Sequence, residues 1–321
     1  MNRLLRVVVI IGLAAAGFAQ EPASRPSVPV ADAVATAEKW LADPARRDAV
    51  ASPYPAIEIE HRVYAAPRPI NVLIVKVDLS APGTEFVLTK PDPSKGDDGK
   101  PYETRSQTTL AFAKETGVQL AVNTSAFGPL RGKPGEPMDV AGLAAVEGKV
   151  FSKPAKRYGA IYISREGRVS LKQPADEKKN VWTVIPGFRM LIDDREICLE
   201  QAESDTPFGG LNPRTAVGVD RDGRTLWIVV VDGRQPEFSM GMTLAEMAAL
   251  FRGLGVWDAL NLDGGGSSTL VLQGDDGEHR VLNTTVGGKL RQVANNLGLR
   301  LAKKGGASKP APPGSGPGAK P

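Results

Sequence analysis

The sequence predicts an α+β fold in which helices pack on a mixed β-sheet core. One observation is a β-hairpin: Asp222-Gly223, a strong two-residue turn signal, separates β-branched and apolar runs at 215–220 and 225–231. A second is a β-α-β crossover, in which the helical pattern at 243–254 leads into an apolar strand at 257–262. Strands joined by a crossover run parallel, so we expect parallel and antiparallel strands in one sheet.

The N-terminus has the pattern of a targeting segment. Arg3 and Arg6 precede an apolar run at 7–18, and small residues around Ala19 form a cleavage site. The apolar run is shorter than the ~20 residues that cross a membrane easily. We therefore expect residues 1–19 to be a cleaved signal peptide, which predicts a secreted or periplasmic protein with no stable membrane span. An uncleaved anchor is the alternative.

Residues 20–56 are predicted to form a linker and an N-terminal helical extension. The segment 20–29 is rich in Pro and Ser, as linkers are. A helical pattern of apolar residues then covers 30–51, with a break at Pro44. This extension is expected to pack on the main domain.

Residues 57–301 form the predicted main domain, which consists mostly of short strands. Alternation at 57–63 predicts a half-buried strand, with His61 on its apolar side as a core histidine. The continuously apolar run 70–77 predicts a strand buried on both faces. The long Gly- and Pro-rich segment 128–138 is interpreted as a loop that covers the substrate. The other predicted elements are a helix at 108–116 and strands at 118–122, 140–152, 160–164, 169–171, 181–192, 280–283 and 291–301.

Charge and cysteine content narrow the function class. The net charge is +4, but two of the 40 basic residues lie in the signal peptide and four in the Lys/Pro/Gly/Ala tail at 302–321, which is predicted to be disordered. The remaining 34 basic and 36 acidic residues give 20–301 a net charge of −2. Without a basic stripe or an aromatic platform, a nucleic-acid partner is not expected. Cys198 is the single cysteine, so no internal disulfide forms.

Polar residues at strand ends predict a site. In the hairpin, Arg214 at the start of the first strand should lie near Asp232 at the end of the second. Parallel strands would bring Asp232 and Asp263 to one carboxyl edge, where ligands bind in such sheets. Asn123 ends another buried strand. The loop after Asp263 contains Gly264, Gly265, Gly266 and Ser267. Three glycines allow a cup of N–H groups for a phosphate or sugar oxygen, with a flexible turn as the alternative.

Several of these segments belong to motifs that occur together. They are Asn-Pro-Arg-Thr-Ala-Val-Gly at 212–218, Asp-Gly at 232–233, Gly-Met-Thr-Leu-Ala-Glu-Met at 241–247 and Asn-Leu-Asp-Gly-Gly-Gly-Ser-Ser-Thr at 261–269. In these motifs the chain resembles the phosphodiester glycosidase domain family. A weaker likeness covers 57–200, where the family has an Asn-Gly-Gly-Phe-Phe-like run. Only Asn123 and Phe127 match that run, so the substrate pocket is expected to differ there.

The resemblance implies an exported hydrolase of sugar-1-phosphodiesters, such as N-acetylglucosamine-α-1-phosphodiesters in envelope or extracellular glycans. The phosphate is a good leaving group, so the site needs a strong general acid less than ordinary glycosidases do. It needs a cation for the phosphate, for which Arg214 is suited as a bidentate clamp. It needs a carboxylate facing the anomeric carbon or its water, a role that suits Asp263 and Asp232. Donors for the sugar would come from Asn123, Gly264, Gly265, Gly266 and Ser267.

Alternatives stay open at this level. The chain could instead be a non-catalytic glycan-binding module, or a metal-dependent phosphodiesterase that cuts the P–O bond. Arg214 could form a structural ion pair with Asp232, and Glu246 fits a helix capping box with Thr243. No cofactor is predicted, while two neighbouring acids leave a divalent metal ion open. The oligomeric state and the choice of base or nucleophile, which depends on the carboxylate separation, are also open.

Overall fold

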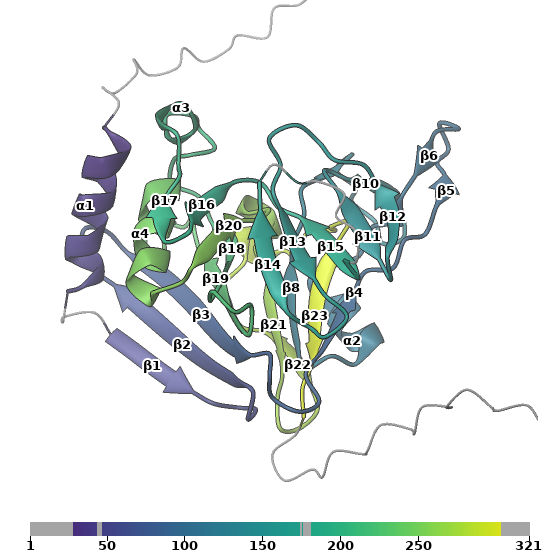
Figure 1. The fold of residues 1–321 in the computed structure, drawn as a ribbon, viewed down its shortest axis with the longest axis horizontal. Helices are drawn as coiled ribbons and strands as arrows, with labels where there is room; N and C mark the ends of the chain where they lie inside the picture. Colours follow the sequence, from purple (N-terminus) through teal and green to yellow (C-terminus); the bar gives the residue numbers. More distant parts are fainter. Residues whose placement is uncertain (1–27, 44–46, 174, 176–180, 303–321) are drawn as a thin grey trace, which may run out of the picture.

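An eight-stranded antiparallel sheet is the largest layer of the fold (Figure 1), which a computed structural model describes over residues 28–43, 47–173, 175 and 181–302. Its strand order is β1-β2-β3-β19-β18-β20-β16-β17. The strands are β1 (Arg47–Ala51), β2 (Ile57–Tyr64), β3 (Ile70–Asp78), β16 (Met190–Asp193), β17 (Glu196–Ile197), β18 (Arg214–Val219), β19 (Thr225–Val231) and β20 (Asp258–Asn261). The predicted hairpin is therefore the pair β18–β19, in the middle of this sheet.

Two helices, α1 (Val30–Leu41) and α4 (Leu244–Leu254), cover one face of this sheet. Their buried apolar side chains share a core cluster with those of β3, β18 and β19. Helix α4 begins with a complete capping box, because Thr243 and Glu246 each accept the other's backbone N–H. It ends at Gly255, whose left-handed conformation (φ 75°) is the usual C-terminal cap.

Two five-stranded sheets cover the other face, and the largest apolar core lies between them and the eight-stranded sheet. The first has the order β22-β21-β8-β23-β4, and the second has the order β12-β11-β15-β13-β14. Their strands are β4 (Glu85–Leu88), β8 (Leu120–Asn123), β11 (Ala144–Val146), β12 (Lys149–Ser152), β13 (Ala160–Ile163), β14 (Val169–Lys172), β15 (Thr183–Pro186), β21 (Leu270–Gln273), β22 (His279–Val281) and β23 (Asn296–Arg300).

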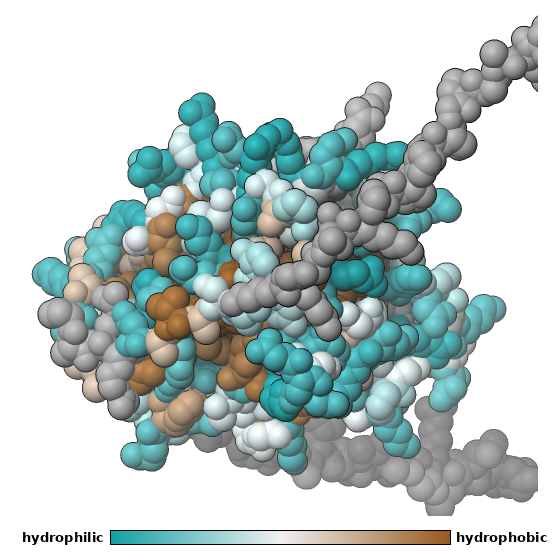
Figure 2. Space-filling view, turned by 90° about the horizontal axis from the view of Figure 1, so that it is seen from below, coloured by the Kyte–Doolittle hydropathy of each residue, from teal (hydrophilic) through white to brown (hydrophobic). Residues whose placement is uncertain are grey.

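Smaller elements surround these layers. Helix α2 (Thr109–Thr116) packs on the outer side of the first five-stranded sheet, through a cluster with residues of β8 and β21. The others are β5 (Ser94–Lys95), β6 (Pro101–Tyr102), β7 (Thr104–Arg105), β9 (Phe127–Gly128), β10 (Pro137–Val140), α3 (Gln201–Ser204), η1 (Gly265–Ser267) and η2 (Val286–Gly288). Seen from below in Figure 2, apolar residues gather in the middle of the face, and polar residues border them.

The prediction of a sheet-rich fold with helices packed on it is confirmed, but the prediction of a mixed sheet was wrong. Every strand pair in the described part of the chain is antiparallel. Strands β19 and β20, which α4 connects, run in the same direction but are not neighbours. Strand β18 lies between them and pairs antiparallel with both. No pattern in the sequence distinguishes this arrangement from one in which β19 and β20 pair directly with each other.

The N-terminal prediction also needs correction. The predicted helix 30–51 ends at Leu41, and 47–51 form β1, which pairs with β2 as an edge strand of the main sheet. The predicted signal peptide 1–19 and all of the tail except Ala302 lie outside the described residues. Within the described ranges, the helices are too short or too polar to cross a membrane.

Candidate active site

The two predicted acids leave the main sheet at the same edge. Asp232 directly follows β19, and Asp263 follows β20 by two residues. Strand β18 fixes this arrangement, because Arg214 pairs with Val231 and Ala216 pairs with Asn261 near its start. The expectation of a common edge thus holds even though β19 and β20 are not neighbours.

Asn123 fastens the opposite sheet to the loop that carries Asp263. Its side-chain amide donates to the Asp263 carbonyl oxygen over 2.6 Å, and its Oδ1 accepts the Thr215 hydroxyl and the Thr269 N–H. Asn123 is fully buried. The Asn123 amide therefore bonds to protein groups, in contrast to the predicted contact with the sugar, and it positions the loop that carries Asp263.

The glycine-rich loop holds the Asp263 carboxylate in place. The Ser267 hydroxyl and the Gly264 N–H both hydrogen-bond to it. Gly265 has a positive φ of 60° and donates its N–H to the Pro213 carbonyl over 2.9 Å. A Cβ on Gly264 would stand 2.6 Å from that same carbonyl oxygen, so the backbones approach too closely for any other residue. These N–H groups serve the protein, which differs from the predicted cup for a substrate oxygen.

The prediction that the Arg214 guanidinium joins the two acids was wrong. Arg214 is only 2% exposed, and its guanidinium donates to the carbonyls of Met242, Phe208 and Gly210 over 2.9, 2.8 and 2.5 Å. Burial lowers its pKa to about 10. The alternation of side chains along β18 explains the error. Arg214 lies on the same face of the strand as Ala216, which belongs to the helix-covered core. It forms neither the predicted phosphate clamp nor the alternative ion pair with Asp232.

Replacing Arg214 by Met should lower the free energy of unfolding by about 3 kcal/mol, because the variant leaves three carbonyl groups without their donor. Urea unfolding measures this effect. Arg234→Met is the matched control: Arg234 is exposed, so its loss should change stability by no more than about 0.5 kcal/mol. Equal stability of Arg214→Met and the wild type would contradict the structural role.

Two other arginines, which the sequence analysis did not identify, lie at the glycine loop. Arg234 extends to within 3.3 Å of where a Cβ on Gly265 would be, and it donates to Asn212 Oδ1 over 2.8 Å. The Arg291 guanidinium lies 2.4 Å from a Cβ position on Gly266, and its positive charge lowers the pKa of Asp263. The glycines therefore make room for two guanidinium groups.

The sequence held one signal for this pair. That signal is the position of Arg234, two residues after Asp232. In the structure Arg234 adopts a positive φ of 58°, as residues in tight turns beside sites often do. Arg291 was assigned to a strand at 291–301, but β23 begins only at Asn296, so Arg291 lies in a loop. Only the tertiary fold brings it to Gly266.

Asp232 is held by a loop from the opposite sheet. Its Oδ1 accepts hydrogen bonds from the Asn283 amide over 3.1 Å and from the Thr284 N–H over 3.0 Å. The Asn283 amide also donates to the Ser268 carbonyl, which links Asp232 to the glycine loop. His61, predicted as a core histidine, hydrogen-bonds to Asn71 over 3.2 Å and lowers the pKa of Asp232 through its charge.

Burial raises the pKa of both acids to about 6. Desolvation of the charged form is the largest cause for each. The hydrogen bonds from Asn283 and Thr284 to Asp232, and those from Ser267 and the Gly264 N–H to Asp263, act in the opposite direction. Asp263 remains partly exposed, whereas Asp232 is 6% exposed. Two carboxyl groups with raised pKa values at one strand edge are typical of a catalytic site.

Replacing Asp232 by Asn should flatten the dependence of stability on pH. Folding raises the pKa of Asp232, so its protonated carboxyl contributes stability below about pH 4. The wild-type protein loses this contribution as the pH increases through about 6. Relative to the wild type, the variant should therefore gain up to about 3 kcal/mol of unfolding free energy between pH 4 and pH 7. Urea unfolding at several pH values measures this gain. A constant difference between the two proteins would contradict the raised pKa.

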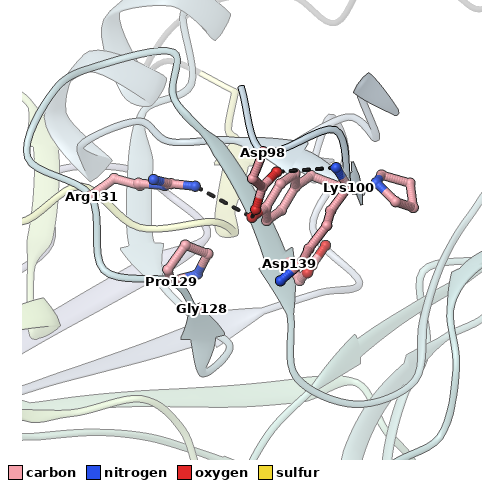
Figure 3. A pocket seen from close by; sticks show the side chains of 8 residues that line it. Asp98, Lys100, Gly128, Pro129, Arg131 and Asp139 are labelled. Atoms are coloured by element: carbon pink, nitrogen blue, oxygen red, sulfur yellow. Dashed lines mark hydrogen bonds between the residues drawn. The ribbon is translucent and has the colours of Figure 1, made fainter. Parts of the chain in front are cut away.

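A separate pocket of about 520 Å³ lies beside the predicted substrate-covering loop (Figure 3). Arg131 of that loop donates to the Tyr102 hydroxyl, which in turn donates to Asp98. Asp139 and Lys100 also line the pocket, and burial raises the pKa of Asp139. The lining thus carries charges of both signs, and it does not include the two candidate acids.

A metal site at the two acids has no support from side-chain clustering. In the part of the chain that the structure describes, Asp193, Asp194 and Asp258 form the single group of three ligand-type side chains close enough to hold an ion. Asp258 is half-buried and begins β20, so this group lies at the strand end opposite Asp263.

Comparisons with known proteins identify the family of the chain. A model of the phosphodiester glycosidase family matches residues 116–300. The chain is 44% identical over 119 residues to the human N-acetylglucosamine-1-phosphodiester alpha-N-acetylglucosaminidase, which is 35% of this chain and 22% of that protein. It is 29% identical over 205 residues to the SPbeta prophage-derived uncharacterized protein YomE of Bacillus subtilis, which is 60% of this chain and 30% of that protein.

A solved structure extends the likeness to the fold. The zebrafish N-acetylglucosamine-1-phosphodiester alpha-N-acetylglucosaminidase catalytic domain, auto-inhibited by its pro-peptide, superposes with a TM-score of 0.55 at 20% identity. The match covers 80% of this chain and 88% of that one. The curated relatives are much longer than the region that matches. This chain spans about a third of their length or less.

Proposed function

Because this chain belongs to the phosphodiester glycosidase family, we propose that it is an exported hydrolase of sugar-1-phosphodiester bonds, of the N-acetylglucosamine-α-1-phosphodiester kind, in envelope or extracellular glycans. One observation carries the proposal: two carboxyl groups with raised pKa values and two arginines gather around one glycine loop. Export, and with it a secreted or periplasmic location, is supported by the signal-peptide pattern at 1–19.

Asp263 is the proposed residue at the anomeric carbon. It is partly exposed, and the Ser267 and Gly264 hydrogen bonds fix its orientation. Water adds to the anomeric carbon, its proton passes to a carboxylate, and the carbon–oxygen bond to the phosphate breaks. The electron pair stays on the phosphate oxygen, so the products are a free sugar and a phosphomonoester. Asp232 supplies the second carboxyl group of the pair that glycosidases use.

Arg234 and Arg291 take over the role first predicted for Arg214. A phosphodiester carries one negative charge, and the leaving phosphomonoester gains a second as the bond breaks. Guanidinium groups placed where this charge develops stabilise the transition state more than the bound substrate. Arg291 also neutralises part of the charge on Asp263, which keeps the carboxylate available at neutral pH.

Release of free N-acetylglucosamine from a synthetic N-acetylglucosamine-α-1-phosphate methyl ester tests the proposal. We expect turnover by the wild-type protein that persists in the presence of EDTA. Binding of this ester without turnover would indicate a glycan-binding module instead. Formation of sugar phosphate, lost on addition of EDTA, would indicate a metal-dependent phosphodiesterase that cuts the P–O bond.

A further inference from the structure

The side-chain amide of Asn283 has a fixed orientation. Its NH₂ group donates to Asp232 Oδ1 over 3.1 Å and to the Ser268 carbonyl oxygen over 3.1 Å. Its own Oδ1 accepts the Leu270 N–H over 2.8 Å. If the amide were flipped, its oxygen would face two acceptors, and its NH₂ group would face the Leu270 N–H donor. Because Asn283 is also buried, it always presents a hydrogen-bond donor to Asp232.

The Asp232 carboxyl group has one bound oxygen and one free oxygen. The Thr284 N–H, like the Asn283 amide, donates to Oδ1, over 3.0 Å. Within the described part of the chain no hydrogen bond reaches Oδ2, and this oxygen is not sealed from solvent either. Since two donors occupy Oδ1, a proton on the carboxyl group is carried by Oδ2. Oδ2 is therefore the oxygen that a water molecule or a ligand can reach.

The backbone of Asp232 is held as firmly as its side chain. Its N–H donates to the Asn71 carbonyl over 3.1 Å, and its carbonyl accepts the Ser239 hydroxyl over 2.7 Å. The Ser239 hydroxyl oxygen also accepts the Asn71 N–H over 3.0 Å. Gln235 donates to the Thr284 carbonyl over 3.0 Å, which ties the turn after Asp232 to the segment that binds Oδ1. These bonds together fix the direction in which Oδ2 points.

We infer that Asn283 is a positioning residue for the hydrolysis: it holds Asp232 so that Oδ2 is the oxygen that gains or loses a proton during the reaction. The inference rests on the proposed function, which places Asp232 in the catalytic pair. The same amide donates to the carbonyl of Ser268, which follows Ser267, whose hydroxyl bonds to the Asp263 carboxylate. Asn283 therefore connects the supports of the two acids, and its loss should change the ionisation of Asp232 as well as its direction.

Titration by ¹³C NMR of protein labelled at the aspartate carboxyl carbons tests the inference without any turnover. The Asp232 signal is the one that Asp232→Asn removes. Its pKa is about 6 in the wild type. Asn283→Ala removes a donor that favours the carboxylate, so the pKa of Asp232 should rise by about one unit. His61 is the side chain whose charge acts on Asp232, and it is present in every variant. An unchanged pKa would overturn the inference.

Steady-state kinetics on an N-acetylglucosamine-α-1-phosphodiester tests the role of Asn283 in the reaction. Asn283→Ala should lower kcat by about tenfold or more and leave KM within about twofold of the wild type. A higher pKa of Asp232 moves one limb of a bell-shaped pH profile upward, so the pH optimum should rise by about half a unit. An optimum that stays in place would show that Asn283 acts on stability alone, which contradicts a positioning role.

Asn283→Asp is the variant to use if Asn283→Ala does not fold. It keeps the volume of the side chain and an acceptor for the Leu270 N–H, but it replaces the donor to Asp232 with a second carboxyl group. Like charges in contact resist ionisation, so the last proton of this pair should leave at a higher pH than the wild-type value of about 6. Loss of that proton at or below pH 6 would overturn the inference.

Gln119→Ala is the matched control. Gln119 is buried to the same degree as Asn283, at 8% exposed. Its amide also donates to a backbone carbonyl and to a side-chain oxygen, and its Oε1 accepts the Leu301 N–H. It precedes β8, whose other end carries Asn123.

This control should keep the wild-type pKa of Asp232 and the wild-type pH optimum. An equal rise of the Asp232 pKa in Gln119→Ala would mean that any buried amide has this effect, which would overturn the inference. Absence of turnover by the wild type would overturn the proposed hydrolysis. The NMR titration would still decide whether Asn283 controls Asp232, because it involves no substrate.

Discussion

Asp263→Asn should reduce sugar release from an N-acetylglucosamine-α-1-phosphodiester by about 10³-fold or more, with the effect on kcat and not on KM. The amide keeps the size and the hydrogen-bonding shape of the side chain, so Ser267 and Gly264 still orient it. It loses the negative charge that accepts a proton from water or faces the developing positive charge at the anomeric carbon. Steady-state kinetics on the purified variant measures the loss.

Asp258→Asn is the control for this experiment. Asp258 begins the strand that Asp263 follows, and burial raises its pKa too, but it lies at the opposite strand end. This variant should keep wild-type activity. If Asp263→Asn retained activity within about tenfold of the wild type while folded, Asp263 would not be the residue at the reacting carbon.

Arg291→Met should lower kcat/KM for the phosphodiester by about 10²-fold, because a charge-assisted bond to phosphate contributes about 1.5–3 kcal/mol. At a pH well above the Asp263 pKa of about 6, where that carboxyl stays ionised without the Arg291 charge, the same variant should hydrolyse a p-nitrophenyl glycoside of the same sugar nearly as well as the wild type does. That leaving group is activated and carries no phosphate, so it does not need the guanidinium. The ratio of the two activities is therefore the measurement.

Arg221→Met serves as its control, since that guanidinium lies over Trp257, 5.0 Å from the ring centroid, away from the glycine loop. Equal losses on both substrates in Arg291→Met would show that Arg291 maintains the shape of the loop and does not contact phosphate. Adding Arg234→Met should deepen the loss on the phosphodiester alone.

The sequence was sufficient to predict the parts of the site that local patterns determine. Asp222-Gly223 set the hairpin, and the strand ends then placed Asp232 and Asp263 at one edge. The glycines after Asp263 predicted a close approach of the backbone to a ligand, whereas the close approach in the structure is to the Pro213 carbonyl oxygen. These features depend on turn chemistry and on the alternation of side chains along a strand.

The sequence could not show which way Arg214 points or that Arg234 and Arg291 lie at the glycine loop. Arg214, the first residue of β18, lies on the helix-covered face, where three carbonyls accept hydrogen bonds from its Nε and Nη2 groups. Arg291 reaches Gly266 from a loop more than twenty residues away in the chain. Tertiary packing determines the direction of a side chain at a strand end and the contacts between distant loops. Short sequence motifs do not predict this packing.

Hydrolysis of an N-acetylglucosamine-α-1-phosphodiester in H₂¹⁸O tests the central claim most directly, because the position of the label identifies the broken bond. Attack at the anomeric carbon predicts that the ¹⁸O is found in the anomeric hydroxyl of the free sugar, while the released phosphomonoester is unlabelled. Label in the phosphate group would mean that water attacks phosphorus. That result would contradict glycosidic cleavage at Asp263.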